Sequence, residues 1–308
     1  MAVWLDEVIQ EEPLLFPGHA ACAGCGPAIN MRHFLGALKA ATPDREIVMV
    51  IPASCWTIIA GAWPVSAFGV SVYLTPFASA AAEASGIKAA LRQRGLGDTH
   101  VVVWGGDGST NDIGFATVSA AAERNEDIIY VLNDNEAYMN TGVQKSGATP
   151  EGAWTTTTPT TAPRRGIKKD MDRIMAAHRI PYVATLAAGS LPLLKDFRGK
   201  VARAAEIEGF RFLHCLGACP PGWRYPTGDS VEIVHRAIDS HYFPLLEVDD
   251  GVWKITNRPK KPLPVAEFLA TQGRFAHLGE AEIALVQQHV DERWELLERL
   301  EQSSAAAV

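Results

Sequence analysis

Four of the five cysteines stand where thiolates could bind a metal centre. Cys22 and Cys25 form a Cys-x-x-Cys pair among small residues, which in an intracellular chain indicates a redox dithiol, zinc or an iron–sulfur cluster. Cys55 and Cys219 each follow a predicted strand, at the end where α/β folds build their sites. Four thiolates suit a 4Fe-4S cluster or structural zinc, and spacing alone does not choose between them. The alternative is that Cys55 and Cys219 are small buried apolar residues, as we expect for Cys215 inside a strand.

A second group of residues is typical of a magnesium–diphosphate site. A predicted strand runs into Gly106-Asp107-Gly108-Ser109, where glycines let the backbone approach a phosphate. We expect Asp107 to be an exposed carboxylate, a hard oxygen ligand suited to Mg²⁺. Asn135 follows the next predicted strand and offers an amide oxygen, and Asn133 is the alternative amide. Gly-Asp-Gly alone is often only a turn, but together with this amide it resembles the arrangement found in thiamine diphosphate enzymes.

The elements that must position these residues are short apolar runs alternating with helical patterns. The alternation predicts an α/β fold with a doubly wound, mostly parallel sheet. The predicted strands are Ile47–Pro52, His100–Trp104, Ile128–Leu132, Pro181–Thr185, Phe210–Leu216 and Pro244–Val248. The predicted helices are Ala28–Ala40, Ser79–Arg94, Gly114–Arg124, Asp170–His178 and Leu191–Glu208.

Two segments depart from this alternation. Residues 142–169 form a long loop rich in Thr, Gly and Pro, and long irregular loops in compact domains are often functional. Residues 1–250 are expected to form the α/β domain, and residues 251–308 a C-terminal arm ending in an amphipathic helix over residues 279–301. That helix either docks on its own domain or makes subunit contacts.

Composition excludes several classes of protein. The 308 residues carry 28 basic and 35 acidic side chains, and a net charge of −7 argues against a general nucleic-acid binder. With 47% hydrophobic and 20% charged residues the chain is globular, and five cysteines are too few for a disulfide scaffold. We expect no membrane span, because no apolar run reaches about 18 residues, and no signal peptide. The predicted location is therefore cytoplasmic.

The combination of motifs resembles the β subunits of multi-subunit 2-oxoacid:ferredoxin oxidoreductases, most closely the pyruvate type. The likeness rests on six stretches: Gly18–Gly26, Gly106–Gly108, Asn135–Gln144, Thr155–Pro159, Cys219–Pro226 and Gln272–Phe275. It implies the diphosphate-binding half of the thiamine diphosphate-binding fold. The combination is specific, because its two parts predict different cofactors in one chain.

The resemblance also implies roles for individual residues. A 4Fe-4S cluster would be held by Cys22, Cys25, Cys55 and Cys219. Mg²⁺ would be bound by Asp107, the Asn135 side chain and the Ala137 carbonyl, and Asn140 would contact the 2-oxoacid or its adduct. The family commonly carries Thr at the position of Asn135, where an amide oxygen can serve equally. The loop over residues 142–169 would cover the cofactor, and Thr155–Thr158 would lie near it. The residues implied to bind the cofactor are Gly106, Asp107, Gly108, Ser109, Asn135, Ala137, Asn140 and Cys55.

The implied reaction is thiamine diphosphate-dependent oxidative decarboxylation of a 2-oxoacid, with pyruvate as first choice. Electrons would pass through the cluster to ferredoxin, and coenzyme A would usually take the acyl group. No second cofactor-sized domain is expected within 308 residues, so the activating glutamate is expected on an α subunit, with γ and ferredoxin-like δ subunits beside it. Alternatives are phenylglyoxylate, oxalate or another 2-oxoacid as substrate, NAD as acceptor, a cluster-free thiamine diphosphate enzyme, and a zinc-stabilised assembly protein.

Overall fold

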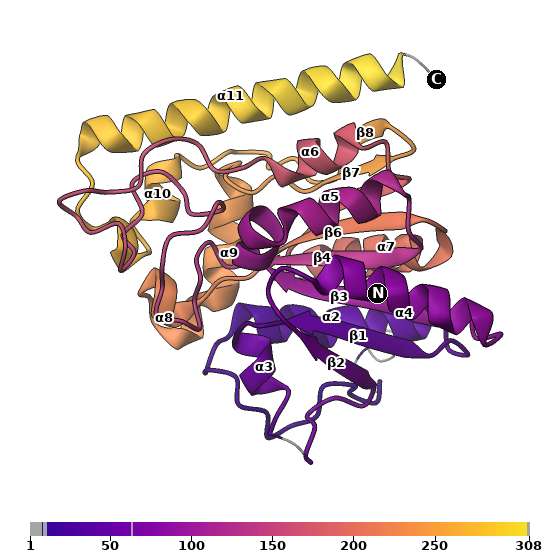
Figure 1. Ribbon diagram of the computed structural model, residues 1–308. Helices are drawn as coiled ribbons and strands as arrows, with labels where there is room; N and C mark the ends of the chain where they lie inside the picture. The colour runs from indigo at the N-terminus through magenta and orange to yellow at the C-terminus, as the bar shows by residue number, and fades with distance from the viewer. Residues whose placement is uncertain (1–7, 9–10, 63, 307–308) are drawn as a thin grey trace.

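Six parallel strands form most of one sheet, and two antiparallel strands extend one of its edges (Figure 1). The computed structural model describes residue 8 and residues 11–62 and 64–306. The strand order is β2-β1-β3-β4-β6-β5-β7-β8. Their bounds are β1 Ile47–Pro52, β2 Ser71–Thr75, β3 His100–Gly106, β4 Ile128–Asp134, β5 Tyr182–Leu186, β6 Phe210–Leu216, β7 Leu246–Asp249 and β8 Val252–Ile255. The predicted α/β class and mostly parallel sheet are confirmed.

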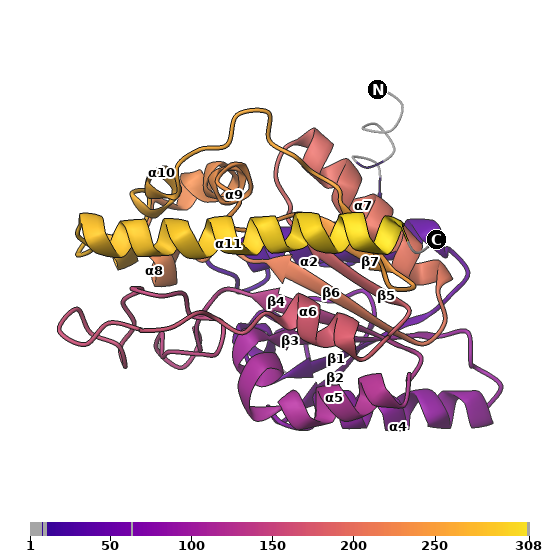
Figure 2. The ribbon, with the colours of Figure 1, turned by 90° about the horizontal axis from the view of Figure 1, so that it is seen from above.

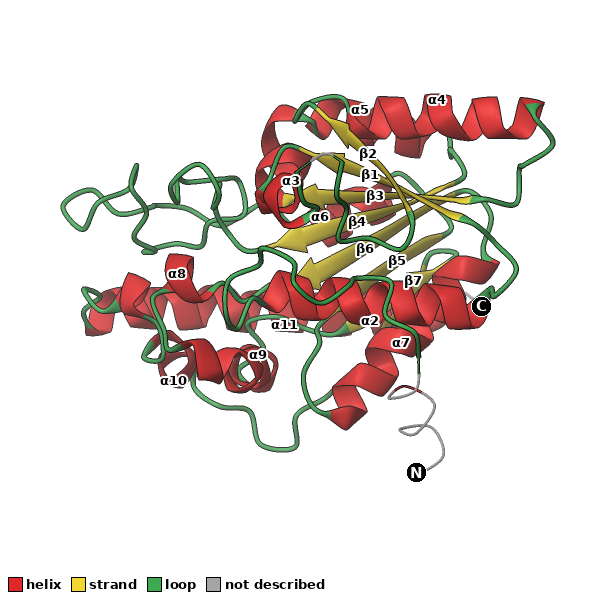
Figure 3. Cartoon of the chain, turned by 90° about the horizontal axis from the view of Figure 1, so that it is seen from below, coloured by secondary structure: helices red, strands yellow, loops and turns green. Residues whose placement is uncertain are grey.

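The register of the central strands brings their carboxyl ends to one edge. β3, β4 and β6 are buried along nearly their whole length, as expected for parallel strands covered on both faces. Gly106 pairs with Asn133, and Asn133 pairs with Cys215, so the segments that follow these strands leave the sheet side by side. Figure 3 shows the strand arrows of β4 and β6 pointing toward the side from which the long loops extend.

Helices cover both faces of the sheet (Figure 2). One face carries α2 (Gly26–Ala41) and α7 (Leu191–Glu206), whose apolar side chains share a core with Trp104 of β3. The opposite face carries α4 (Ala80–Gln93), α5 (Phe115–Glu123) and α6 (Met171–Ala177). The doubly wound arrangement is thus confirmed, and it leaves the carboxyl edge of the sheet free to build a site.

The C-terminal helix α11 (Glu280–Ala305) lies along the β7–β8 edge of the sheet (Figure 1). It buries Val286, Val290 and Leu297 of the predicted apolar face. Two β8 backbone N–H groups donate to its side chains, Trp253 to Ser304 Oγ at 3.0 Å and Ile255 to Glu301 Oε1 at 2.8 Å. The helix therefore caps an edge strand that would otherwise present free backbone groups. The division at residue 250 stays a prediction.

Several short elements were not predicted: β2, β8, α3 (Cys55–Ile59), α8 (Pro220–Trp223), α9 (Ser230–Asp239) and α10 (Val265–Leu269). β2 is an edge strand with half-exposed Tyr73 and Leu74, so it lacks a continuous apolar run. The β7–β8 hairpin turns at Asp250 and Gly251, which both have positive φ, as a type I′ hairpin turn requires.

Within residues 11–62 and 64–306, no helix combines the length and the apolar character needed to cross a membrane.

Candidate functional site

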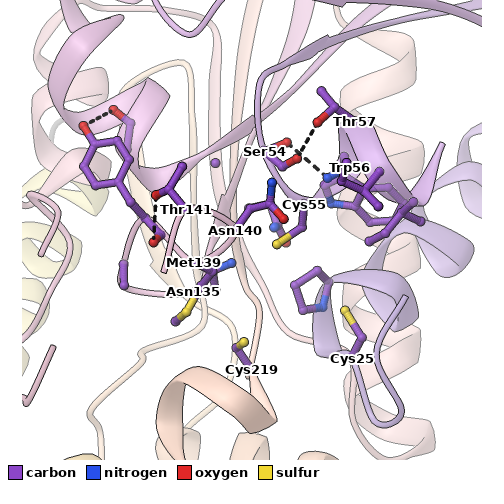
Figure 4. A pocket seen from close by; sticks show the side chains of 18 of the residues that line it. Cys25, Ser54, Cys55, Trp56, Thr57, Asn135, Met139, Asn140, Thr141 and Cys219 are labelled. Carbon is purple, nitrogen blue, oxygen red and sulfur yellow. Dashed lines mark hydrogen bonds between the residues drawn. The ribbon is translucent and has the colours of Figure 1, made fainter. Parts of the chain in front are cut away.

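One cavity at the carboxyl edge of the sheet brings the predicted site residues together (Figure 4). The Cys-x-x-Cys turn, the start of α3, the glycine turn after β3, the segment after β4 and the start of α8 all line it. Its lining includes every predicted ligand and cofactor contact: Cys22, Cys25, Cys55, Gly106, Asp107, Gly108, Ser109, Asn135, Ala137, Asn140 and Cys219. Residues up to about 200 positions apart in the chain thus meet at one site.

Three oxygen-bearing groups meet beside the glycine turn. With the Asn135 amide turned so that its oxygen faces Asp107, that oxygen lies 3.0 Å from Asp107 Oδ1 and 2.9 Å from the Ala137 carbonyl oxygen. With the amide reversed, its NH₂ donates to both groups instead. An octahedral Mg²⁺ with oxygens at about 2.1 Å separates neighbouring ligands by about 3.0 Å. Both separations from the Asn135 side chain therefore suit neighbouring oxygen ligands of one Mg²⁺.

The expectation that Asp107 is exposed is wrong, because only 1% of the residue is accessible. Burial raises the pKa of its carboxyl well above the usual range, and the nearby Asp134 raises it further. The Ser146 hydroxyl donates to Asp107 Oδ2 and partly opposes this rise. A buried carboxylate facing other oxygens is a site where a bound cation would relieve the electrostatic cost.

The two candidate amides occupy different positions. β4 extends to Asp134, so Asn133 belongs to the strand, whereas Asn135 lies in the turn after it beside Asp107. Asn133 also lines the cavity, and its Oδ1 is buried without a hydrogen-bond partner among the described residues. The geometry thus favours Asn135 as the metal ligand and leaves Asn133 as an unsatisfied acceptor at the same cavity.

The glycine turn passes directly into a helical segment. A helix is predicted from Gly114, but a π-helical segment already begins at Gly108 and runs to Ile113, ahead of α5. The Tyr138 ring packs so closely on Gly108 that a Cβ there would lie 2.2 Å from the ring, and its hydroxyl donates to the Gly108 carbonyl at 3.2 Å. Only glycine therefore fits at position 108, and π-helical segments of this kind are frequent at functional sites.

Three of the four predicted cluster cysteines stand at helix starts. Cys25 precedes α2, Cys55 is the first residue of α3, and Cys219 precedes α8. Backbone N–H groups at helix starts stabilise a thiolate. Figure 4 shows Cys25, Cys55 and Cys219 projecting toward the same part of the cavity. Cys22 is exposed at its rim.

A close backbone approach holds the Cys-x-x-Cys turn beside Cys219. The Gly26 N–H donates to the Ala218 carbonyl at 3.0 Å, and a Cβ on Gly26 would lie 2.6 Å from that carbonyl oxygen. Glycine at position 26 is therefore what lets α2 begin next to the Cys219 turn.

All five cysteines are free thiols, of which Cys22 is exposed, Cys25, Cys55 and Cys219 are half-buried, and Cys215 is buried. Burial raises the pKa of Cys25 to about 11 and that of Cys219 to about 12, and the neighbouring cysteines add to both rises. Among the described residues, no three His, Cys, Asp or Glu side chains gather closely enough to hold a metal ion. An iron–sulfur cluster binds its cysteines through different irons, so its ligands stand farther apart than those of a single ion. Four thiols that line one cavity are the type of donor that an iron–sulfur cluster takes.

Of the remaining residues considered from the sequence, some line the cavity and others lie away from it. Asn140 is exposed and lines the cavity (Figure 4), whereas Thr155–Thr158 do not line it. Thr155 and Thr158 instead hydrogen-bond each other at 2.7 Å between their hydroxyls. Cys215 is buried in the apolar core on β6.

Four residues at the site were not predicted: Glu136, Tyr138, Ser146 and Trp223. Trp223 donates from Nε1 to the Asn135 carbonyl at 2.8 Å, and Ser146 contacts Asp107 from the long loop. Glu136 is fully buried and stands in sequence between Asn135, whose side chain faces Asp107, and Ala137. The place of Glu136 between two predicted ligands was its sequence signal, but the partners of its side chain are remote in sequence.

Comparisons with known proteins agree with this geometry. The family described as "Thiamine pyrophosphate enzyme, C-terminal TPP binding domain" matches residues 57–215. The chain is similar to ketoisovalerate oxidoreductase subunit VorB of Pyrococcus horikoshii, with 43% identity over 300 residues, 94% of each chain. It is also similar to pyruvate synthase subunit PorB of Methanocaldococcus jannaschii, with 44% identity over 296 residues, 93% of this chain and 97% of that protein. The fold resembles a solved 2-oxoglutarate:ferredoxin oxidoreductase from Magnetococcus marinus, with a TM-score of 0.56 at 22% identity over 71% of this chain and 77% of that one.

Proposed function

Because this chain belongs to the family of the VorB and PorB oxidoreductase subunits and carries a thiamine pyrophosphate-binding domain, we propose that it builds half of a thiamine diphosphate site and holds the first electron acceptor beside it. One observation carries the proposal. A single cavity is lined both by Asp107, Asn135 and Ala137 and by four cysteines. Two donor sets of different chemistry thus face one space.

The oxygen donors are assigned to Mg²⁺ and the diphosphate. Asp107, the Asn135 amide oxygen and the Ala137 carbonyl would hold the metal, and the spacing near 3.0 Å between these groups supports it. The backbone of Gly106–Ser109 would lie against the diphosphate, because these residues line the same cavity. The exposed amide of Asn140 would contact the 2-oxoacid.

The sulfur donors are assigned to a 4Fe-4S cluster. Cys22, Cys25, Cys55 and Cys219 would supply one thiolate each, and the helix starts at three of them would stabilise the negative charge. Thiamine diphosphate supplies an electron sink for decarboxylation, and the cluster supplies one-electron acceptance. The chain's own residues would place these two groups at one cavity, with the oxygen donors Asp107, Asn135 and Ala137 on its buried part.

Substrate and partners follow from the family at a coarser level. Relatives named for pyruvate and for ketoisovalerate match almost equally, at 44% and 43% identity. We propose a 2-oxoacid substrate, with pyruvate as the first to test, coenzyme A as acyl acceptor and ferredoxin as electron acceptor. The pyrimidine half of the cofactor site is assigned to an α subunit, and γ and ferredoxin-like δ subunits complete a cytoplasmic complex.

The test is purification of the intact complex without oxygen, followed by assays with a panel of 2-oxoacids and a viologen dye. We expect dye reduction that depends on thiamine diphosphate and on one preferred acid among pyruvate, 2-oxoisovalerate, phenylglyoxylate and oxalate. A complex that reduces the dye with none of the 2-oxoacids would overturn the proposal. A colourless, iron-free complex with thiamine-dependent activity would instead support a cluster-free enzyme.

A further inference from the structure

The segment Gln272-Gly273-Arg274-Phe275 lies far along the chain from the cavity, yet its arginine reaches the back of the site. Arg274 is 2% exposed. Its Nη2 lies 2.6 Å from Glu136 Oε2, and its Nε donates to Gln272 Oε1 at 2.9 Å. Nothing in the proposed chemistry uses this segment, so its burial against the metal-binding turn calls for a separate explanation.

Glu136 stands between Asn135 and Ala137 and has a left-handed backbone, with φ of 67°. Left-handed backbone is unfavourable for a residue with a side chain, so surrounding contacts must hold it. The turn sends the Asn135 side chain and Ala137 to the cavity, while the Glu136 side chain is fully buried and absent from the cavity lining. Its N–H donates to Asp134 Oδ1 at 2.9 Å.

The Glu136 carboxylate is held from three separate segments. Lys168 Nζ donates to Oε1 at 2.9 Å and the Tyr242 hydroxyl donates to the same oxygen at 2.7 Å. Arg274 donates to Oε2, so both oxygens of the buried carboxylate have a charged or polar partner. Charge-assisted hydrogen bonds of this kind are the strong ones, and buried networks that are fully satisfied are rigid.

Arg274 also contacts the second cofactor region. Its guanidinium lies over the Trp223 ring, 4.1 Å from the ring centroid. Trp223 ends α8, its backbone N–H donates to the Cys219 carbonyl at 2.8 Å, and its indole N–H donates to the Asn135 carbonyl at 2.8 Å. One arginine therefore touches the carboxylate that supports the metal turn and the ring that supports the Cys219 turn.

We propose that Arg274 is a positioning residue that fixes the metal-binding turn and the Cys219 turn relative to each other, through Glu136 and Trp223. The inference rests on the proposed function, because it concerns the same two cofactor regions. A planar guanidinium can donate to a carboxylate and stack on an indole at once, which a lysine ammonium does not do equally well. Removing the Arg274 guanidinium therefore disturbs the metal-binding turn and the Cys219 turn together.

The test compares Arg274→Met with Arg211→Met in the assembled complex. Arg211 is a matched control: it is also 2% exposed and pairs with an aspartate, Asp127, but it lies near the amino end of β6, at the opposite edge of the sheet. The readouts are the dissociation constant of thiamine diphosphate with Mg²⁺ by calorimetry, the electron paramagnetic resonance spectrum of the reduced cluster, and the melting temperature.

We expect Arg274→Met to weaken thiamine diphosphate binding by about 10- to 100-fold, the usual effect of removing a partner behind a metal ligand, and to change the cluster spectrum. Arg274→Lys should show a smaller effect on both. Arg211→Met should lower the melting temperature and leave both cofactor readouts at the wild-type values. Should Arg274→Met fail to fold, Trp223→Phe takes its place. It keeps a ring under Arg274, removes the N–H that reaches Asn135, and should weaken thiamine diphosphate binding.

Arg274→Met with wild-type cofactor readouts, or with a change at one cofactor region alone, would overturn the inference. If Trp223→Phe has to be used, unchanged thiamine diphosphate binding would overturn it as well. A wild-type complex that binds no thiamine diphosphate in the same titration would overturn the proposed function and, with it, the inference.

Discussion

His214 lies on β6, next to the end of β4, and both of its ring nitrogens face carboxylates. Nδ1 lies 2.8 Å from Asp172 Oδ1 and Nε2 lies 3.0 Å from Asp134 Oδ2. A ring that donates from both nitrogens must carry a proton on each. Burial alone would lower the pKa of His214, but Asp172 and Asp134 outweigh it and raise the pKa from 6.5 to about 9.

This shift makes a prediction about stability against pH. Because the folded pKa lies above the unfolded one, the stabilisation is fully present below pH 6.5 and is lost as the pH rises through about 9. The difference between 6.5 and about 9 corresponds to about 3 kcal/mol of unfolding free energy. His214→Gln should therefore be less stable than wild type at about pH 6, by about 3 kcal/mol, and should lack the loss between about pH 6.5 and pH 9.

The assay is urea unfolding of the full chain across this pH range, with the His214 ring followed by nuclear magnetic resonance in the folded protein. His178→Gln, which removes a half-buried ring at the end of α6, is the control for loss of an imidazole elsewhere. A wild-type chain whose stability is flat from about pH 6 to pH 9, or a ring that titrates near its unfolded pKa, would refute the reasoning.

Two further predictions concern single side chains. Cys219→Ser should lose iron and visible absorbance while Cys215→Ser keeps both, as measured by iron analysis of protein purified without oxygen; loss of iron from Cys215→Ser alone would show that the fourth ligand is misassigned. Gly108→Ala places a Cβ 2.2 Å from the Tyr138 ring and should weaken thiamine diphosphate binding by about tenfold or more in a calorimetric titration. Gly86→Ala, which meets nothing within 4 Å in α4, should leave binding unchanged and raise stability by about 0.5–1 kcal/mol; equal binding by the two variants would contradict the assignment.

The positions of Asp107 and Asn135 were predictable from sequence because both follow buried strands, and parallel neighbours end at one edge. The register pairs Gly106 with Asn133, so the residues that follow β3 and β4, among them Asp107 and Asn135, lie side by side. The four cysteines were also brought to one cavity, as their places after strands and in a glycine-rich turn indicated.

The features that could not be predicted from the sequence depend on tertiary contacts. Aspartate is polar, so the sequence around Asp107 gives no indication that its side chain is buried against Ser146 and the segment after β4. Glu136 and Arg274 form their ion pair across 138 residues of chain, and no periodicity connects them. The edge strand β2 lacked a detectable pattern because only one neighbour covers it.

The central claim is that one chain holds two cofactors through separate donor sets, and cofactor analysis of Asp107→Ala tests it most directly. Iron, thiamine diphosphate and magnesium are measured in wild-type and Asp107→Ala complexes purified without oxygen. We predict that wild type contains all three and that the variant loses thiamine diphosphate and magnesium but keeps its iron. A variant that retains thiamine diphosphate, or a wild-type complex without iron on this chain, would contradict the account.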